Sequence, residues 1–279
     1  MDKVKIKNAL SQKMTGLQLS GNKVAPLIGI SSANVSNILN DKWESISDII
    51  WRKVMVYCGL GSEWQAARTA NMAKIFALCA DAKENHVALA FSFAPGSGKS
   101  YSLTYFAANN PDVAYVECDE YWTKKIFLQK IGQAFGLTLE GTVHDMIEIL
   151  VDNVSRRTNP LIIIDEADKL KDPVLSIFKT LFNRLLNRCG FILSGAPYFK
   201  LRIEKGVARN KQAYTEIYSR LGGEFIPLTP VGANDIAAVC RANGVEDNTT
   251  IQTIIRDAKS DLRQVARLIH KLTKLNNAV

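Results

Sequence analysis

The chain has 279 residues, of which 47% are hydrophobic and 22% charged, and its formal net charge is +8. These values are ordinary for a soluble globular protein with two or three units, and the basic balance favours an acidic partner, nucleic acid first. No apolar run is long enough to cross a membrane, and the five cysteines and three histidines lack metal-ligand spacing. We therefore expect a cytoplasmic protein with reduced thiols and no membrane association.

Residues 1–62 are predicted to form a small helical domain. Within Gly21–Leu39 the spacing resembles a helix-turn-helix of the phage-repressor type, with small Ala25 at the helix crossing, Gly29 at the turn and Val35 facing inward. The outward residues expected to contact DNA are Ser32, Asn34 and Asn37. Because no arginine stands there for guanine readout, we expect weak sequence specificity. A protein-docking module without DNA contact is the alternative.

A glycine-rich stretch, Phe93–Ser100, follows a predicted strand over Val87–Phe91 and precedes a predicted helix over Tyr101–Asn109. Such a turn presents backbone N–H groups at the positive end of a helix, where they cradle phosphate. Lys99 is expected to reach the outer phosphates of a nucleotide, and the Ser100 hydroxyl to hold Mg²⁺. The residues predicted to contact the nucleotide are Pro95, Gly96, Ser97, Gly98, Lys99, Ser100 and Tyr101.

One position departs from the full phosphate-loop pattern, which begins with glycine where this chain has Phe93. Gly96 and Gly98 still supply the close backbone approach. We therefore expect Phe93 to alter how the chain enters the turn without abolishing binding.

The remaining pattern predicts a parallel α/β sheet in residues 63–229 and a helical lid in residues 230–279. A helix is expected over Glu63–Lys83. The further predicted strands are Val113–Glu117, Leu161–Ile164, Phe191–Leu193 and Glu224–Leu228, with helices between them, including Tyr121–Phe135 and Val143–Arg156. The lid is predicted from three amphipathic patterns, Asn234–Arg241, Thr249–Ala258 and Leu262–Leu275.

An acidic pair, Asp165-Glu166, ends the apolar run Leu161–Ile164. At the carboxyl end of a central parallel strand it lies beside the phosphate loop. Asp165 is expected to hold Mg²⁺ through its water shell, and Glu166 to orient or deprotonate the water that attacks the γ-phosphate. The two motifs together predict ATP binding with Mg²⁺, and Glu166 favours hydrolysis.

The order of these parts resembles the AAA+ ATPases, over roughly residues 64–275. The resemblance implies a P-loop AAA+ parallel sheet with a C-terminal helical lid, here preceded by an all-α helix-turn-helix domain. It also implies two further catalytic positions, Ser194 and Arg220, and one further nucleotide-binding position, Arg263. Ser194 would sense the γ-phosphate, Arg220 would reach the nucleotide of a neighbouring subunit, and Arg263 in the lid would contact the γ-phosphate within its own subunit.

Within that family, the repressor-like N-terminal unit and the stretch LIIIDEADKL resemble the Mu B and TnsC type of transposition protein. This resemblance implies ATP-dependent filaments or rings on duplex DNA, a transposase partner and a role in choosing the transposition target. Two alternatives remain open. One is a helicase loader of the DnaC and IstB type, acting in replication, and the other is an ATP-gated DNA scaffold that does not hydrolyse ATP.

A basic stretch between Tyr198 and Arg220 fits a DNA surface, since it holds six basic residues against two acidic ones. Contacts to phosphates would make binding salt-sensitive and largely independent of sequence. The candidate DNA contacts there are Lys200, Arg202, Lys205, Arg209 and Lys211, and a second, weaker patch holds Lys169 and Lys171. A solvated basic face without DNA is the alternative.

Overall fold

The computed structural model describes residues 2–16, 19–44, 46–58 and 64–276. The chain divides into two compact units, residues 1–65 and residues 66–279. No helix within the described residues is long and apolar enough to cross a membrane.

Within its described residues, the first unit has four helices around one small core. They are α1 (Lys3–Gly16), α2 (Gly21–Ile28), α3 (Ser32–Leu39) and α4 (Asp48–Tyr57). The largest side chain of the core, Trp51, is fully buried and meets Trp43 edge to face at 5.6 Å between ring centroids. Two lysines close helix C-termini, because Lys13 donates to the carbonyl of Tyr57 and Lys53 donates to that of Gly29.

Helices α2 and α3 are joined by a tight turn at Gly29, at the positions of the predicted helix-turn-helix. Gly29 has φ +72°, and the N–H of Ile30 donates to Ala25 at 3.1 Å, so the turn closes with a left-handed residue where glycine is favoured. The Ser31 hydroxyl accepts from the N–H of Asn34 at 3.2 Å and caps α3. Pro26 is exposed and lies inside a helix of only eight residues.

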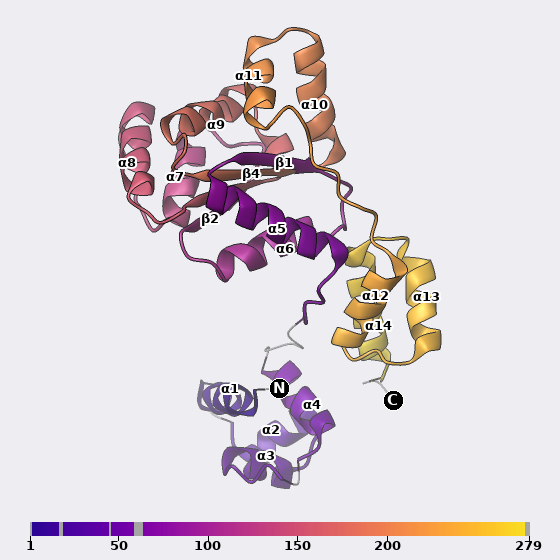
Figure 1. The fold of residues 1–279 in the computed structure, drawn as a ribbon. Coiled ribbons are helices and arrows are strands. Elements are labelled where there is room, and N and C mark those ends of the chain that lie inside the picture. Colours follow the sequence, from indigo (N-terminus) through magenta and orange to yellow (C-terminus); the bar gives the residue numbers. More distant parts are fainter. Residues whose placement is uncertain (1, 17–18, 45, 59–63, 277–279) are drawn as a thin grey trace. The chain divides into compact units, whose positions relative to one another are not determined.

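The second unit is built on a four-stranded parallel sheet in the order β1-β4-β3-β2 (Figure 1). The strands are β1 (Ala88–Ser92), β2 (Val113–Glu117), β3 (Leu161–Asp165) and β4 (Gly190–Gly195). The two central strands, β3 and β4, are buried at every residue, as expected for strands covered on both faces. The sheet confirms the predicted α/β fold class.

One face of the sheet is covered by α5 (Ala70–Asn85) and α6 (Lys99–Ala108). Ile163 of β3 and Ile192 of β4 point toward this face. The helix backbone comes so close to β4 that a Cβ on Gly190 would lie 2.0 Å from the carbonyl oxygen of Ala82. Glycine is therefore required at that position.

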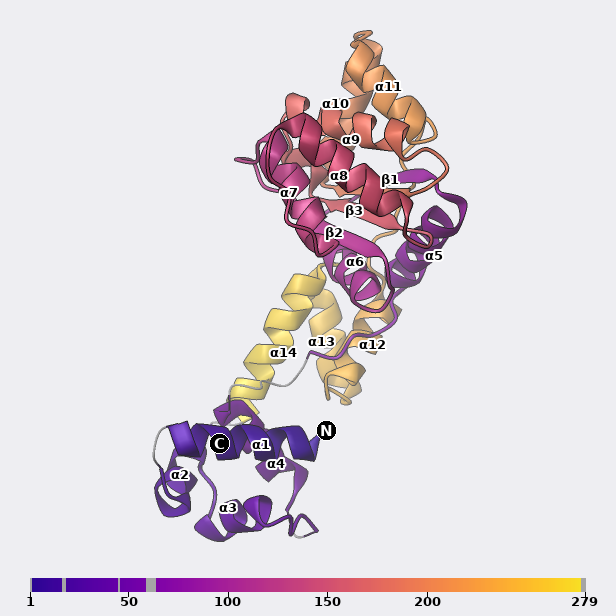
Figure 2. The same cartoon turned by 90° about the vertical axis from the view of Figure 1, so that its left-hand side faces the viewer.

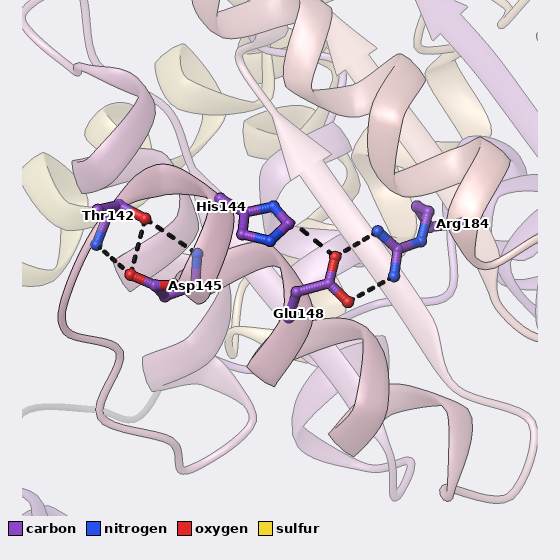
Figure 3. Close-up of polar contacts among 5 residues, drawn as sticks. All are labelled: Thr142, His144, Asp145, Glu148 and Arg184. Carbon is purple, nitrogen blue, oxygen red and sulfur yellow. Dashed lines mark hydrogen bonds and ion pairs between the residues drawn. The ribbon is translucent and has the colours of Figure 1, made fainter.

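The opposite face is covered by α7 (Lys124–Ala134), α8 (Val143–Ser155) and α9 (Asp172–Arg184). The start of α8 has a capping box, in which Thr142 and Asp145 exchange side-chain and backbone hydrogen bonds (Figure 3). These bonds from Thr142 lower the pKa of Asp145. One turn later Glu148 pairs with both terminal nitrogens of Arg184, which joins α8 to α9 (Figure 3).

The predicted strand over Glu224–Leu228 is wrong. Ile226 makes one parallel bridge to Phe91, and its N–H donates to Ala90 at 2.8 Å, but no ladder follows. At the next residue the chain is fixed to α5 rather than to the sheet, because the carbonyl of Pro227 accepts from the ammonium group of Lys74 at 2.6 Å.

Two helical segments complete the unit. Helices α10 (Pro197–Ala208) and α11 (Gln212–Arg220) lie between β4 and the segment that bridges β1. The lid contains α12 (Ala233–Ala242), α13 (Asn248–Ala258) and α14 (Leu262–Asn276) with a core of its own (Figure 2).

Candidate nucleotide site

The phosphate loop connects β1 to α6 as the sequence predicts. Gly96 and Gly98 have φ values of +77° and +85°, a region that side chains disfavour, and Gly98 is the N-cap of α6. Phe93 does not have a positive φ; its N–H donates to the carbonyl of Gly195, and its ring packs against the α5–α6 core. The backbone at this position therefore tolerates a side chain, which explains how the loop forms without its first glycine.

Lys99 holds the loop together. Its ammonium group donates to the carbonyls of Phe93 at 2.7 Å and Ala94 at 3.0 Å. Burial lowers the pKa of Lys99. The negative charges of Asp165 and Glu166 oppose this shift, whereas the positive charge of Arg263 adds to it. The loop lysine is therefore affected by the charges of both members of the acidic pair and of the lid arginine.

Asp165 ends β3 and is almost fully buried. One carboxylate oxygen accepts from the N–H of Glu166 at 2.9 Å, and the other accepts from the Tyr115 hydroxyl at 3.1 Å. Burial and the neighbouring Asp165 raise the pKa of Tyr115, so its proton stays on the phenol as a donor. The carboxylate is thereby held in one orientation, which suits a Mg²⁺ ligand.

Glu166 has φ +53°, an unusual backbone conformation for a side-chain-bearing residue and one that is concentrated at functional sites. Its carboxylate forms an ion pair with Lys169, three residues later. The bond to Glu166 raises the pKa of Lys169. Lys169, predicted as part of a second basic patch, is thus engaged with the acidic pair, whereas Lys171 begins α9 as its N-cap.

Ser194 lies on β4 opposite Phe91 of β1, and it is fully buried. Among the described residues its hydroxyl has no hydrogen-bond partner. A buried polar atom normally has a partner, so an orphaned hydroxyl at this edge of the sheet fits a site made for a polar ligand. The donor set also fits a nucleotide with Mg²⁺, since hydroxyl and carboxylate oxygens are the ligands that this ion takes. Ser100 and Asp165 would hold the ion.

The lid contacts the phosphate loop directly. The N–H of Leu262 donates to the carbonyl of Gly96 at 2.8 Å, and a Cβ on Gly96 would lie 2.0 Å from a carboxylate oxygen of Asp261. That same oxygen accepts from the N–H of Arg263 at 2.8 Å and fixes the first turn of α14. The predicted lid arginine therefore begins a helix that is fastened to the loop.

Two other predicted residues have different surroundings. Arg220, at the end of α11, donates to Asn183 at 2.8 Å and to the carbonyl of Glu216 at 2.9 Å, so it is tied to its own subunit. Tyr101 follows the loop, is 44% exposed and stacks on Tyr105. Pro95 is exposed at the tip of the loop.

The predicted DNA contacts on α10 and α11 separate into two kinds. Lys200, Lys205, Arg209 and Lys211 are exposed, and Lys200 pairs with Glu204 at 3.7 Å. Arg202 does not lie on this exposed face. Its side chain is only 14% exposed, pairs with Asp172 and donates to the carbonyl of Leu170 at 2.7 Å. Both partners follow β3 in the chain, so Arg202 joins α10 to the segment after that strand.

In the N-terminal unit the predicted DNA contacts lie on α3. Ser32 is exposed, and Asn34 and Asn37 are half-buried. The inward positions Val35 and Ile38 are fully buried.

Sequence reasoning missed several polar residues that arrange the site: Asn71, Tyr115, Asp168, Lys169 as a partner of Glu166, and Asp261. Asp168 accepts from the N–H of Ala196 at 2.9 Å, which links the turn after β3 to the start of α10. Asn71 alone had a readable signal, since it occupies the apolar stripe of α5 that continues with Ile75 and Cys79.

Comparisons with known proteins agree with this geometry. Residues 91–203 match the family described as AAA domain. The crystal structure of Cdc6p from Pyrobaculum aerophilum is similar in fold, with a TM-score of 0.53 and 14% identity, and the match covers 74% of this chain and 62% of that chain. The comparison with curated proteins found no match. At this identity the likeness to Cdc6p shows the fold alone.

The matched segment runs from the end of β1 into α10, so it contains the phosphate loop, the acidic pair and Ser194. Family match, sheet order and site geometry thus coincide on the same residues. This part of the chain is an AAA-type P-loop ATPase domain.

Proposed function

We propose that the protein hydrolyses ATP with Mg²⁺ in this site and uses the nucleotide state to control assembly on duplex DNA. The observation that carries the ATPase proposal is the phosphate loop itself, where Gly96 and Gly98 have positive φ and the N–H of Leu262 at the start of α14 donates to Gly96 at 2.8 Å. Lysine and arginine offset the charge of the phosphate oxygens, and the two carboxylates serve the metal and the attacking water.

The residues act on ATP as substrate. The backbone N–H groups of residues 96–100 bind the phosphates, and Lys99 leaves the loop carbonyls for phosphate oxygens. Glu166, released from Lys169, accepts the proton of the water whose oxygen attacks the γ-phosphorus, while the bond from that phosphorus to the bridging oxygen breaks and ADP leaves. Ser100 and Asp165 would hold Mg²⁺, which would supply positive charge to the phosphate oxygens.

The DNA part of the proposal is supported by two surfaces. One is the exposed basic set Lys200, Lys205, Arg209 and Lys211, and the other is the helix-turn-helix of the first unit. Together with the resemblance to the Mu B and TnsC type, they favour a target-selection ATPase that activates a transposase. The helicase loader and the non-hydrolysing scaffold are the competing functions.

The test compares wild type with Glu166→Gln. We expect the variant to bind ATP with unchanged affinity but to hydrolyse it about 10³-fold more slowly, because the base is lost and the phosphate contacts remain. Hydrolysis at the wild-type rate would remove Glu166 as the base. ATP binding without turnover in the wild type itself would favour the scaffold.

Electron microscopy of the same variant with ATP and duplex DNA tests the assembly. The proposal expects filaments or rings on duplex that persist because ATP is not consumed. Assembly only with a hexameric helicase, and none on duplex DNA, would favour the loader.

A further inference from the structure

Asn71, in the first turn of α5, is 2% exposed, and its side-chain amide is paired as a backbone peptide would be. The amide nitrogen donates to the carbonyl of Thr229 at 2.8 Å. The amide oxygen accepts from the N–H of Thr229 at 3.1 Å and from its hydroxyl at 3.3 Å. Thr229 is the last residue before Pro230 and the lid, so this pairing fixes the point where the chain leaves the sheet.

The same turn of α5 reaches two further parts of the site. The Asn71 amide lies 3.5 Å from the carbonyl of Ser97, in the phosphate loop. The N–H of the preceding residue, Ala70, donates to Asp235 in the first turn of α12 at 2.9 Å. Two consecutive residues therefore contact the phosphate loop, the lid hinge and the first lid helix.

The lid is fastened to the phosphate loop at its other end as well, through the bond from Leu262 to Gly96. The hinge at Thr229 and the start of α14 thus both depend on where the loop lies. Asparagine suits the hinge position because it supplies a donor and an acceptor on one rigid amide, and a buried backbone group left without a partner is costly.

We propose that Asn71 is a positioning residue that couples nucleotide occupancy of the phosphate loop to the placement of the lid. The proposal rests on the proposed ATP binding. When phosphates order the backbone of residues 96–100, the carbonyl of Ser97 is fixed, and Asn71 fixes Thr229 relative to it. The lid then presents Arg263 to the nucleotide. By linkage, a lid held in place raises nucleotide affinity by the same factor.

The experiment measures hydrogen exchange of the full chain with and without Mg²⁺ and a non-hydrolysable ATP analogue. In wild type we expect the nucleotide to slow exchange in the loop, residues 93–100, and in two lid segments, residues 229–236 and 258–265. In Asn71→Ala at saturating nucleotide, the loop stays protected, residues 229–236 lose that protection, and residues 258–265 keep only the part that the bond from Leu262 to Gly96 supplies. Nucleotide affinity falls about tenfold, the effect of one lost set of buried hydrogen bonds.

The matched control is Asn85→Ala, at the other end of the same helix, where an exposed asparagine donates to Asp81 at 2.7 Å. It should leave both sets of protection at wild-type values. Should Asn71→Ala fail to fold, Asn71→Asp keeps the size and the acceptor but replaces the donor, and the same loss in the lid segments is expected.

Three outcomes separate the possibilities. Loss of lid protection with loop protection intact supports the coupling. Protection of both loop and lid in a folded Asn71 variant, even one with a lowered melting temperature, overturns the coupling and leaves ATP binding standing. No protection of the loop in wild type overturns the proposed function and the coupling that rests on it.

Discussion

The nucleotide site and the α10–α11 segment use cationic side chains in opposite ways. At the site, half-buried Lys99 donates to the carbonyls of Phe93 and Ala94, so fixed partners favour one geometry. On α10 and α11 most of the basic residues are exposed and act through charge rather than geometry. The first arrangement makes each residue indispensable, whereas the second makes contributions nearly additive.

Arg220 is the last residue of α11, but its expected role is at the nucleotide site of a neighbouring subunit. We expect Arg220→Ala to lower ATP hydrolysis by roughly 10³-fold at protein concentrations that support assembly, since a guanidinium supplied from outside stabilises the charge of the transition state. The measurement is steady-state phosphate release against protein concentration. Unchanged activity at high concentration would place Arg220 with the structural arginines, held by Asn183 and Glu216.

Arg202 and Lys205 sharpen the contrast within one helix. Arg202→Met should lower the free energy of unfolding by about 2 kcal/mol, because Asp172 and the carbonyl of Leu170 lose a charged donor. Lys205→Met, the matched control, should change it by less than about 0.5 kcal/mol. Urea unfolding of both variants measures the difference. Equal values would mean that Arg202 does not join α10 to the chain after β3.

Substitutions in the exposed basic set of α10 and α11 should have the smallest effects, and each should lower the affinity for duplex DNA by a similar factor. Replacing Lys205 and Arg209 by glutamine is expected to weaken binding to duplex DNA about tenfold and to lower the slope of log affinity against log salt by about 2, one unit for each lost phosphate contact. Fluorescence anisotropy at several salt concentrations measures this. An unchanged slope would move the DNA surface away from α10.

Much of the fold follows from local pattern. The strand predicted over Val113–Glu117 has those bounds in the structure, and β3 and β4 extend the predicted runs by one and three residues. The bounds of buried parallel strands can be predicted from the sequence because each strand is a continuous apolar run between polar turns. The run Glu224–Leu228 looks similar in the sequence, but in the structure only Ile226 bridges to β1, and the carbonyl of Pro227 accepts from Lys74 of α5.

Residues adjacent in the chain make up the phosphate loop, the acidic pair at the end of β3 and the predicted helix-turn-helix, so all three could be predicted from local pattern. Which charged side chains stay exposed depends instead on contacts between segments that are far apart in the chain. In the folded chain Arg202 forms an ion pair with Asp172, and Lys169 forms one with Glu166. Asn71 donates a hydrogen bond to Thr229, which is 158 residues away in the sequence. Hydrogen bonding between distant segments leaves no periodic signature, so such partners are found only when the chain has folded.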